Sequence, residues 1–320
     1  MTAQKLIDSV YFIPNATNIG IIACKNEKSK THEIYLVDTG MTSADGKHIL
    51  QELAELFPDA DGGFSVKTIL STHSHADHSG GNKYIMEQTG CELWATENEA
   101  GSMSNPFLQS AVIWGGNPIS EITGPYYTAE AAAPTHIIHA ADTITLNSAG
   151  KIAFLALPGH YFEMTGILFT NTHGESVLFA GDAIFGREHI LKYWIPFLYD
   201  VRQFKQTLDR LLTVDALWFV PSHGKPVQRI DETAEMNKIA ILSTEFCILH
   251  VLRKKDLPFE DIVKQVADTN DITLKTTQFA LISCTLRSYM TYLAQEKKVS
   301  YYVKENKMYW HLEPDGMSAL

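Results

Sequence analysis

The sequence predicts an α/β protein with a small helical part at its C-terminal end. Up to about residue 230, short apolar segments rich in β-branched and aromatic residues alternate with amphipathic helical segments. Several of the expected strands end at a histidine or an aspartate beside a glycine or a proline. Beyond residue 230, three helical segments precede a hairpin. Strand–helix alternation with reactive residues at strand ends is typical of α/β architectures whose loops carry the functional groups.

Turn-forming residues divide the first part of the chain into strands and helices. Helix 43–58 carries leucines and isoleucines along one face, with Ser43 as its expected N-cap. Strand 65–73 runs directly into a histidine-rich loop, and a helix is expected to begin there. The expected strands are 9–14, 18–25, 32–40, 65–73, 91–97, 151–160, 165–171, 175–182 and 216–224, and a further helix is expected over 203–214.

Segment 96–141 differs from the rest of the first part. It is rich in glycine, proline and small residues, carries Trp114 and the pair Tyr126-Tyr127, and shows no sustained periodicity. A long irregular loop inside a compact domain is commonly functional and often forms a lid. The alternative is a surface insertion that packs only locally.

Residues 231–320 predict a second, smaller domain after a first domain of residues 1–230. Helical patterns at 231–254, 258–269 and 275–298 are followed by a hairpin at 299–312, with a turn near Glu305-Asn306. Helices followed by a hairpin suggest a winged-helix-like module. Such modules also serve as dimerisation or active-site-covering elements, so a homodimer is one arrangement that the sequence allows.

Charge and cysteine content limit the classes of partner. The chain has 320 residues, with 26 Lys+Arg against 37 Asp+Glu and a net charge of −11. Phosphate contacts require Lys and Arg, so we expect a small-molecule substrate rather than a nucleic acid. The four cysteines form no Cys-x-x-Cys pair, and neither a signal-peptide pattern nor a membrane-length apolar run is visible. These features predict a cytoplasmic protein with no membrane partner.

The segment ILSTHSHADHSGGN, residues 69–82, predicts a metal site. His73 and His75 point the same way if the backbone is extended, and Asp77 and His78 follow within the same loop. Imidazole nitrogens and carboxylate oxygens suit a borderline divalent ion such as zinc, or iron or manganese. The glycines after Ser79 let the backbone approach a neighbouring segment closely and begin a helix.

Three further candidate ligands lie in the same setting, where an apolar strand meets a turn. His160 follows the strand FLALPG, Asp182 follows VLFAG, and His223 follows LWFVPS. A lone histidine after a strand is more often structural than a ligand. Seven candidate ligands at four equivalent strand ends instead favour a metal centre, and they are His73, His75, Asp77, His78, His160, Asp182 and His223.

The ordered motifs resemble those of the metallo-β-lactamase-fold hydrolases. The resemblance rests on His-x-His-x-Asp-His at 73–78 and on PGH at 158–160, GD at 181–182, PSHG at 221–224 and VDTG at 37–40. It implies an α-β-β-α sandwich of two mixed sheets flanked by helices, with two divalent ions, zinc being expected, at the loop edge. It also implies a first metal held by His73, His75 and His160, a second held by Asp77, His78 and His223, and a bridge by Asp182.

The same resemblance implies hydrolysis by a metal-activated hydroxide that Asp77 helps to orient. In this family a bridging aspartate accompanies thioesterases, lactonases and nucleases, so the expected bond is a thioester, a lactone or a phosphodiester rather than a β-lactam. The sequence PSHGKP around His223 departs from the acidic-aromatic pattern of glyoxalase-II-like thioesterases.

Three alternatives to this hydrolase remain open. Persulfide dioxygenases resemble the same motifs but use one iron, held by residues matching His73, His160 and Asp182. A lactamase-like ribonuclease is opposed by 11 Lys+Arg against 13 Asp+Glu in residues 231–320. A non-catalytic DNA-binding regulator is opposed by the complete ligand set. For the substrate, we expect contacts from Arg187, Tyr193 and Trp114.

Overall fold

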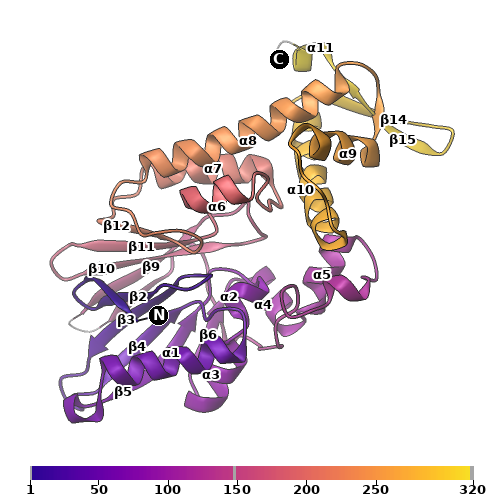
Figure 1. Ribbon diagram of the computed structural model, residues 1–320. Helices are drawn as coiled ribbons and strands as arrows, with labels where there is room; N and C mark the ends of the chain where they lie inside the picture. Colours follow the sequence, from indigo (N-terminus) through magenta and orange to yellow (C-terminus); the bar gives the residue numbers. More distant parts are fainter. Residues whose placement is uncertain (1, 147–148, 318–320) are drawn as a thin grey trace.

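Two β-sheets pack face to face in the computed structural model, which describes residues 2–146 and 149–317 (Figure 1). Buried residues of both sheets, among them Phe12, Ile22, Phe154 and Phe169, form one apolar cluster between them. Helices cover the outer face of each sheet. The expected α-β-β-α sandwich of two mixed sheets is therefore confirmed.

The first sheet has seven strands that lie in chain order. The pairs from β1 to β4 are antiparallel, and the pairs from β4 to β7 are parallel. Isoleucines in β3 alternate between the two faces, as a strand buried on both sides requires. The strands are β1 (Gln4–Ile7), β2 (Val10–Ile13), β3 (Ile19–Lys25), β4 (His32–Val37), β5 (Phe64–Leu70), β6 (Glu92–Ala95) and β7 (His136–Ile137).

The second sheet has five strands in the order β12-β11-β10-β9-β8. Its pairs are antiparallel except for β11 with β12, which is parallel. This arrangement places the ends of β9, β11 and β12 near those of the first sheet. The strands are β8 (Thr143–Leu146), β9 (Gly150–Ala156), β10 (Thr165–Asn171), β11 (Ser176–Gly181) and β12 (Trp218–Pro221).

Helices α1 (Ser43–Leu56) and α3 (Asn82–Thr89) cover the first sheet, and α7 (Val201–Leu211) lies on the second. The N-cap of α1 is Thr42 rather than the expected Ser43. Thr42 Oγ1 accepts from the backbone N–H of Asp45, and the Asp45 carboxylate accepts from that of Thr42, a reciprocal pair that Ser43 is one residue too late to form.

Segment 96–141 contains two short helices instead of one irregular loop. They are α4 (Glu97–Ser104) and α5 (Phe107–Trp114), followed by a 3₁₀ turn at Ser120–Ile122. Apolar residues of this segment, including Ile113 and Ile122, pack against Ala280 of the C-terminal helices. Tertiary packing therefore supports helices that are too short to be recognised from periodicity.

The C-terminal part has the three helices and the hairpin that the sequence predicts. Glu305 and Asn306 adopt φ of 51° and 60°, as a two-residue hairpin turn requires. The elements are α8 (Asp231–Leu252), β13 (Leu257–Pro258), α9 (Phe259–Thr269), α10 (Thr276–Gln295), β14 (Val299–Lys304), β15 (Lys307–Leu312) and α11 (Pro314–Met317). Its description as a winged helix stays a prediction.

The apolar core runs across residue 230 without a break. Phe204 of α7, Ile241 of α8 and Met290 of α10 belong to one buried cluster. Lys205 Nζ lies 2.8 Å from Oε1 of the buried Glu245, which joins α7 to α8 by an ion pair. The domain boundary at 230 is therefore not marked by a gap in packing, and it stays a prediction. Among the described residues, no helix is long and apolar enough to cross a bilayer.

Gly80 allows the histidine-rich loop to lie against the segment after β4. Its N–H donates to Gly40 O over 2.8 Å, and a Cβ atom at this position would come within 1.7 Å of Met41 O. The φ angle of Gly80 is an ordinary −67°, so the requirement is close approach rather than backbone conformation. This contact sets the position of the residues that precede it.

The substitution Gly80→Ala is expected to lower the free energy of unfolding by about 1–3 kcal/mol or more, because the new methyl group overlaps a backbone carbonyl. Urea denaturation followed by circular dichroism measures the change. Gly101→Ala is the matched control, because Gly101 is an exposed position of α4 with no atom within 4 Å of the added Cβ. The control is expected to gain about 0.5–1 kcal/mol. Equal stability of the two variants would contradict the close-approach argument.

Candidate metal centre

The four strand ends singled out in the sequence meet at one edge of the sandwich. His73 and His75 lie in the loop after β5, and Asp77 and His78 lie in the short helix α2 (Ala76–Ser79). The other three residues follow β9, β11 and β12. Their ligand atoms form overlapping groups in which every atom lies within 4.8 Å of the others, and the groups are His73, His75 and His160; His73, His78 and Asp182; and Asp77, His78 and His223.

The first group consists of three buried imidazoles. Nδ1 of His75 lies 3.1 Å from Nε2 of His73 and 2.9 Å from Nε2 of His160. Three ring nitrogens therefore face one another, and one cation can accept the lone pairs of all three. The expected first ligand set is thus brought together.

The second group lies at the more open side of the centre. His223 Nε2 is 3.2 Å from Asp77 Oδ2, and His78 Nε2 is 3.6 Å from the same oxygen. Asp77 and His223 are half-buried, while His78 is fully buried. The expected second ligand set is therefore also assembled, with access from the side of Asp77 and His223.

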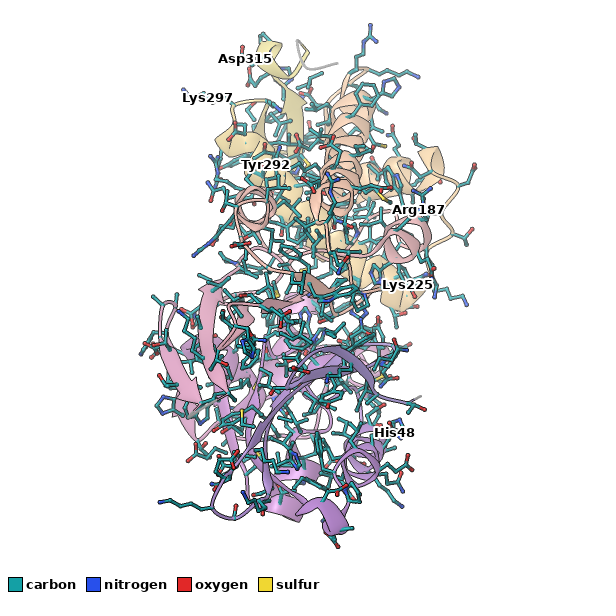
Figure 2. All side chains as sticks on the ribbon, turned by 90° about the vertical axis from the view of Figure 1, so that its left-hand side faces the viewer. His48, Arg187, Lys225, Tyr292, Lys297 and Asp315 are labelled. Atoms are coloured by element: carbon teal, nitrogen blue, oxygen red, sulfur yellow. The ribbon has the colours of Figure 1, made fainter. Side chains whose placement is uncertain are left out.

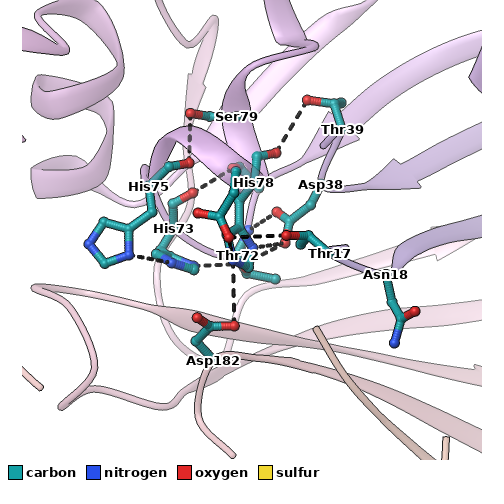
Figure 3. A network of polar contacts seen from close by, with 12 residues as sticks. Thr17, Asn18, Asp38, Thr39, Thr72, His73, His75, His78, Ser79 and Asp182 are labelled. Atoms are coloured by element: carbon teal, nitrogen blue, oxygen red, sulfur yellow. Dashed lines mark hydrogen bonds and ion pairs between the residues drawn. The ribbon is translucent and has the colours of Figure 1, made fainter. Parts of the chain in front are cut away.

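Asp182 lies between the two groups. Its Oδ2 is 3.3 Å from His160 Nε2 in the first group, and its Oδ1 is 3.4 Å from His78 Nε2 in the second. Figure 3 shows Asp182 reaching from the second sheet toward the loop that carries His73 and His78. One carboxylate thus faces both triads, which is the position that a bridging ligand needs.

Two buried atoms of this cluster lack a hydrogen-bond partner among the described residues. They are Nε2 of His78 and Oδ1 of Asp182. An unsatisfied buried polar atom costs about 1–3 kcal/mol, and a cation between these two atoms satisfies both. The donor set of imidazoles and carboxylates and these two orphaned atoms fit divalent metal ions.

Surrounding groups fix which nitrogen of each imidazole faces the centre. Asp38 Oδ2 lies 2.8 Å from His78 Nδ1 and accepts a 2.7 Å hydrogen bond from Thr72 Oγ1. Because Thr72 donates to Asp38, its oxygen is free to accept from His73 Nδ1, 3.1 Å away. Nδ1 of His160 donates to Phe197 O over 2.9 Å. Each of these three rings is therefore held through its outer nitrogen, and its other nitrogen faces the centre.

The turn between β2 and β3 holds the second group. Ala16 O lies 2.9 Å from Nδ1 of His223, and Thr17 Oγ1 donates to Asp77 Oδ2 over 3.1 Å. Asn18 Nδ2 donates to Pro221 O and Gly224 O on either side of His223. A single short turn therefore positions ligands that are far apart in the sequence.

A buried carboxylate on α4 holds the histidine loop from the other side. Glu99 Oε2 accepts from the N–H and the hydroxyl of Ser74, which stands between His73 and His75, and Oε1 accepts from Glu163 N. Burial raises the pKa of Glu99 to about 7. Segment 96–141 is thus tied directly to the loop that carries the first ligands.

Charges separate across the centre. Burial, and then the other imidazoles, hold the pKa of His73 and of His75 well below the usual range. Burial opposes ionisation of Asp182, but His223, His78 and His160 outweigh it and hold its pKa well below the usual range. Asp77 and Asp182 overcome the burial of His78 and raise its pKa to about 10. The first group is therefore neutral and the second strongly ionic.

Aromatic residues border the open side. The ring of His189 stacks on His223 with centroids 4.8 Å apart, and Tyr193 lies 4.8 Å from His189. Tyr126 is 56% exposed and lies next to Tyr127, with ring centroids 4.9 Å apart. Of the expected substrate residues, Tyr193 thus contacts His189, whose ring in turn stacks on the candidate ligand His223.

The other two expected substrate residues lie elsewhere. Arg187 begins α6 (Arg187–Lys192), is at the molecular surface (Figure 2), and has Nη1 3.9 Å from Glu232 Oε1 of α8. Trp114 ends α5 and is 41% exposed, and no contact with the candidate ligands is found for it in the part of the chain that the structure describes. Their roles stay predictions.

Sequence reasoning did not assign Asp38, Thr72 or Glu99. The sequence does contain a signal for Asp38, because the aspartate of VDTG ends an apolar strand. In the structure this residue adopts a left-handed φ of 58°. Thr72 is adjacent to His73 in the motif, whereas nothing in the local sequence of Glu99 indicates a buried acceptor.

The family model of the metallo-beta-lactamase superfamily matches residues 14–223, more than half of the chain, and the chain belongs to this superfamily. A hydroxyacylglutathione hydrolase from Thiobacillus denitrificans (strain ATCC 25259 / T1) is 24% identical over 125 residues, which are 39% of this chain. The match spans only 35% of that relative's length. Members of this superfamily are mostly hydrolases, and this chain carries the candidate metal-binding groups described above.

Two solved structures resemble almost the whole chain. A beta-lactamase domain protein from Burkholderia ambifaria matches with a TM-score of 0.73 and 16% identity, covering 97% of this chain and 95% of its own. A metallo-beta-lactamase family protein from Thermus thermophilus matches with a TM-score of 0.71 and 19% identity, covering 97% of this chain and 100% of its own. At these identities the likeness concerns the fold, and it extends over the C-terminal part.

The substitution Asp38→Asn is expected to weaken metal binding about 10–100-fold, because the acceptor that orients His78 and Thr72 is lost or reversed. Competition with a chromophoric chelator measures the affinity. Asp8→Asn is the control, since Asp8 is an exposed carboxylate that pairs with Lys5 on the surface. An affinity that Asp38→Asn leaves unchanged would show that this carboxylate does not orient the ligands.

Proposed function

We propose that this protein hydrolyses an ester-type bond with the help of two divalent ions, zinc being the expected metal, and that thioesters are its first substrate class. The observation that carries the proposal is the position of Asp182, whose two oxygens face both histidine groups at 3.3 Å and 3.4 Å. Two complete groups on either side of one carboxylate favour two ions over one.

Two divalent ions bound here would bring the pKa of a shared water toward neutrality and polarise the substrate oxygen. The chain's own residues supply the rest. Asp77, held by Thr17, is half-buried at the open side, and we assign it the orientation of the nucleophile. Asp38, Thr72 and the carbonyl of Phe197 keep the imidazoles in one tautomer.

The choice of thioesters rests on two supports. An aspartate in the bridging position accompanies thioesterases, lactonases and nucleases among the resembled hydrolases rather than true β-lactamases. The name of the relative from Thiobacillus denitrificans also describes a thioester hydrolase, although it is only 24% identical over 125 residues. Lactones come next. Phosphodiesters in RNA are disfavoured by the net charge of −11.

A mononuclear iron dioxygenase is the second candidate. It needs only residues matching His73, His160 and Asp182, and these three are close together here. A dioxygenase with one iron would not use the second group as metal ligands, although His223 Nε2 lies 3.2 Å from Asp77 Oδ2 in that group. The fully assembled second group therefore favours hydrolysis.

Metal analysis of the protein purified without chelators, joined to a panel of thioesters, lactones, phosphodiesters and a glutathione persulfide, tests the proposal. We expect about two equivalents of zinc and release of a free thiol from thioesters. Bound iron with oxygen uptake on the persulfide would overturn hydrolysis and favour the dioxygenase.

The substitution Asp182→Asn is expected to lower kcat about 100-fold or more, because the metals contribute several kcal/mol to transition-state stabilisation and lose their shared ligand. Steady-state kinetics on the substrate found in the panel measure the loss. Asp215→Asn, at an exposed aspartate after α7, is the control and is expected to keep full activity. Full activity of Asp182→Asn would refute the bridged arrangement.

A further inference from the structure

Helix α8 presents a single exposed stripe to solvent. Figure 1 shows the helix along the outer edge of the molecule, where it covers α7. Exposed positions recur every three or four residues, so they share one face, and the intervening residues are buried or half-buried. The stripe consists of Asp231, Glu232, Glu235, Ile239, Leu242, Phe246 and His250, and Arg253 continues it.

The middle of the stripe is apolar. Ile239, Leu242 and Phe246 are 52%, 54% and 50% exposed, and Leu191 on the neighbouring α6 is 69% exposed. A hollow of about 500 Å³ beside them is lined in part by Trp194. Large apolar side chains gathered in one exposed patch mark a binding surface more often than scattered ones do.

The two ends of the stripe carry opposite charges. Glu232 and Glu235 lie at the N-terminal end, while Arg253 lies at the C-terminal end, next to the polar side chain of His250 along the stripe. Within residues 2–146 and 149–317, Glu235 and Arg253 form no ion pair, and the pair of Glu232 with Arg187 is long and exposed. Charges of both signs thus remain available to a partner.

The order of residues along the stripe makes it complementary to the same stripe of a second copy that runs in the opposite direction. If two copies of α8 lie antiparallel with a two-fold axis beside residues 242 and 243, position 232 faces 253, position 235 faces 250, and position 239 faces 246. Acidic residues then meet basic ones at both ends, and apolar residues meet in the middle. In a parallel arrangement, the acidic ends of the two helices would lie against each other. A partner other than a second copy would need a surface on which the charges follow the complementary order.

We propose that the exposed stripe of α8 binds the same stripe of a second copy of this chain, antiparallel, in a two-fold symmetric dimer. An isologous contact of this kind requires each surface to complement itself, and the order of residues in the stripe meets that requirement. The contact also covers Leu191 and so braces α6, whose His189 stacks on His223 of the metal centre. This inference does not depend on the reaction proposed above.

Sedimentation velocity of the full chain over a range of concentrations tests the dimer. The wild type is expected to show twice the chain mass of 35.7 kDa. Leu242→Asp is expected to weaken association roughly 30-fold or more, because a charge enters the apolar centre of the contact. Leu212→Asp, at a leucine that is 43% exposed after α7, is the matched control and keeps the dimer.

Charge reversal tests the antiparallel register without disturbing the apolar centre. Glu232→Arg and Arg253→Glu are each expected to weaken the dimer, and the double variant is expected to restore it, since the opposed pair is rebuilt with the signs exchanged. Circular dichroism checks that each variant is folded. A monomeric wild type, a dimer that survives Leu242→Asp, or a double variant no tighter than the single ones would overturn the proposal. A monomer that binds phosphatidylcholine vesicles would assign the stripe to a lipid surface instead.

Discussion

The structure depends on holding five imidazoles and two carboxylates together in a place largely closed to water. Neutral imidazoles crowd one side, where Nδ1 of His75 lies within 3.1 Å of two other ring nitrogens, and ionised carboxylates occupy the other. Nε2 of His78 and Oδ1 of Asp182 face each other at 3.4 Å, and neither makes a hydrogen bond to a described residue. The surrounding hydrogen bonds supply the rigidity that such an arrangement requires, because four of the five rings are held through their outer nitrogen.

Both sheets and several loops contribute to that rigidity. Asp38 ends β4 of the first sheet and reaches His78 and Thr72, while Gly80 allows the loop after β5 to lie against the same strand end. Thr17 holds Asp77 from the turn after β2. The strand ends of the second sheet bring the remaining ligands to the same edge. The fold thus converts residues spread over most of the first part of the chain into one compact donor set.

The ligands were predictable because each stands where an apolar strand stops, and that signal is local. The hairpin turn at Glu305-Asn306 was predictable for the same reason. Glu99 and the helix α5 were not predictable, because their roles arise from contacts with segments far away in the sequence. Glu99 is 25 residues from Ser74, and its carboxylate accepts a hydrogen bond from the hydroxyl of Ser74. Residue type alone suggests Ser43 as the N-cap of α1. Thr42 is the N-cap because its side chain accepts from the backbone N–H of Asp45.

Segments close to the candidate metal centre are held by the C-terminal helices. Tyr126 comes from segment 96–141, whose Ile113 and Tyr127 pack with Ala280 of α10. Phe197, whose carbonyl holds His160, packs against the same cluster. Segment 96–141 and Phe197 therefore rest on α10, whereas most of the ligands lie at strand ends of the two sheets. Changes in α10 should consequently reach the centre through segment 96–141 and through the contact of Phe197 with His160, while the other ligands stay in place.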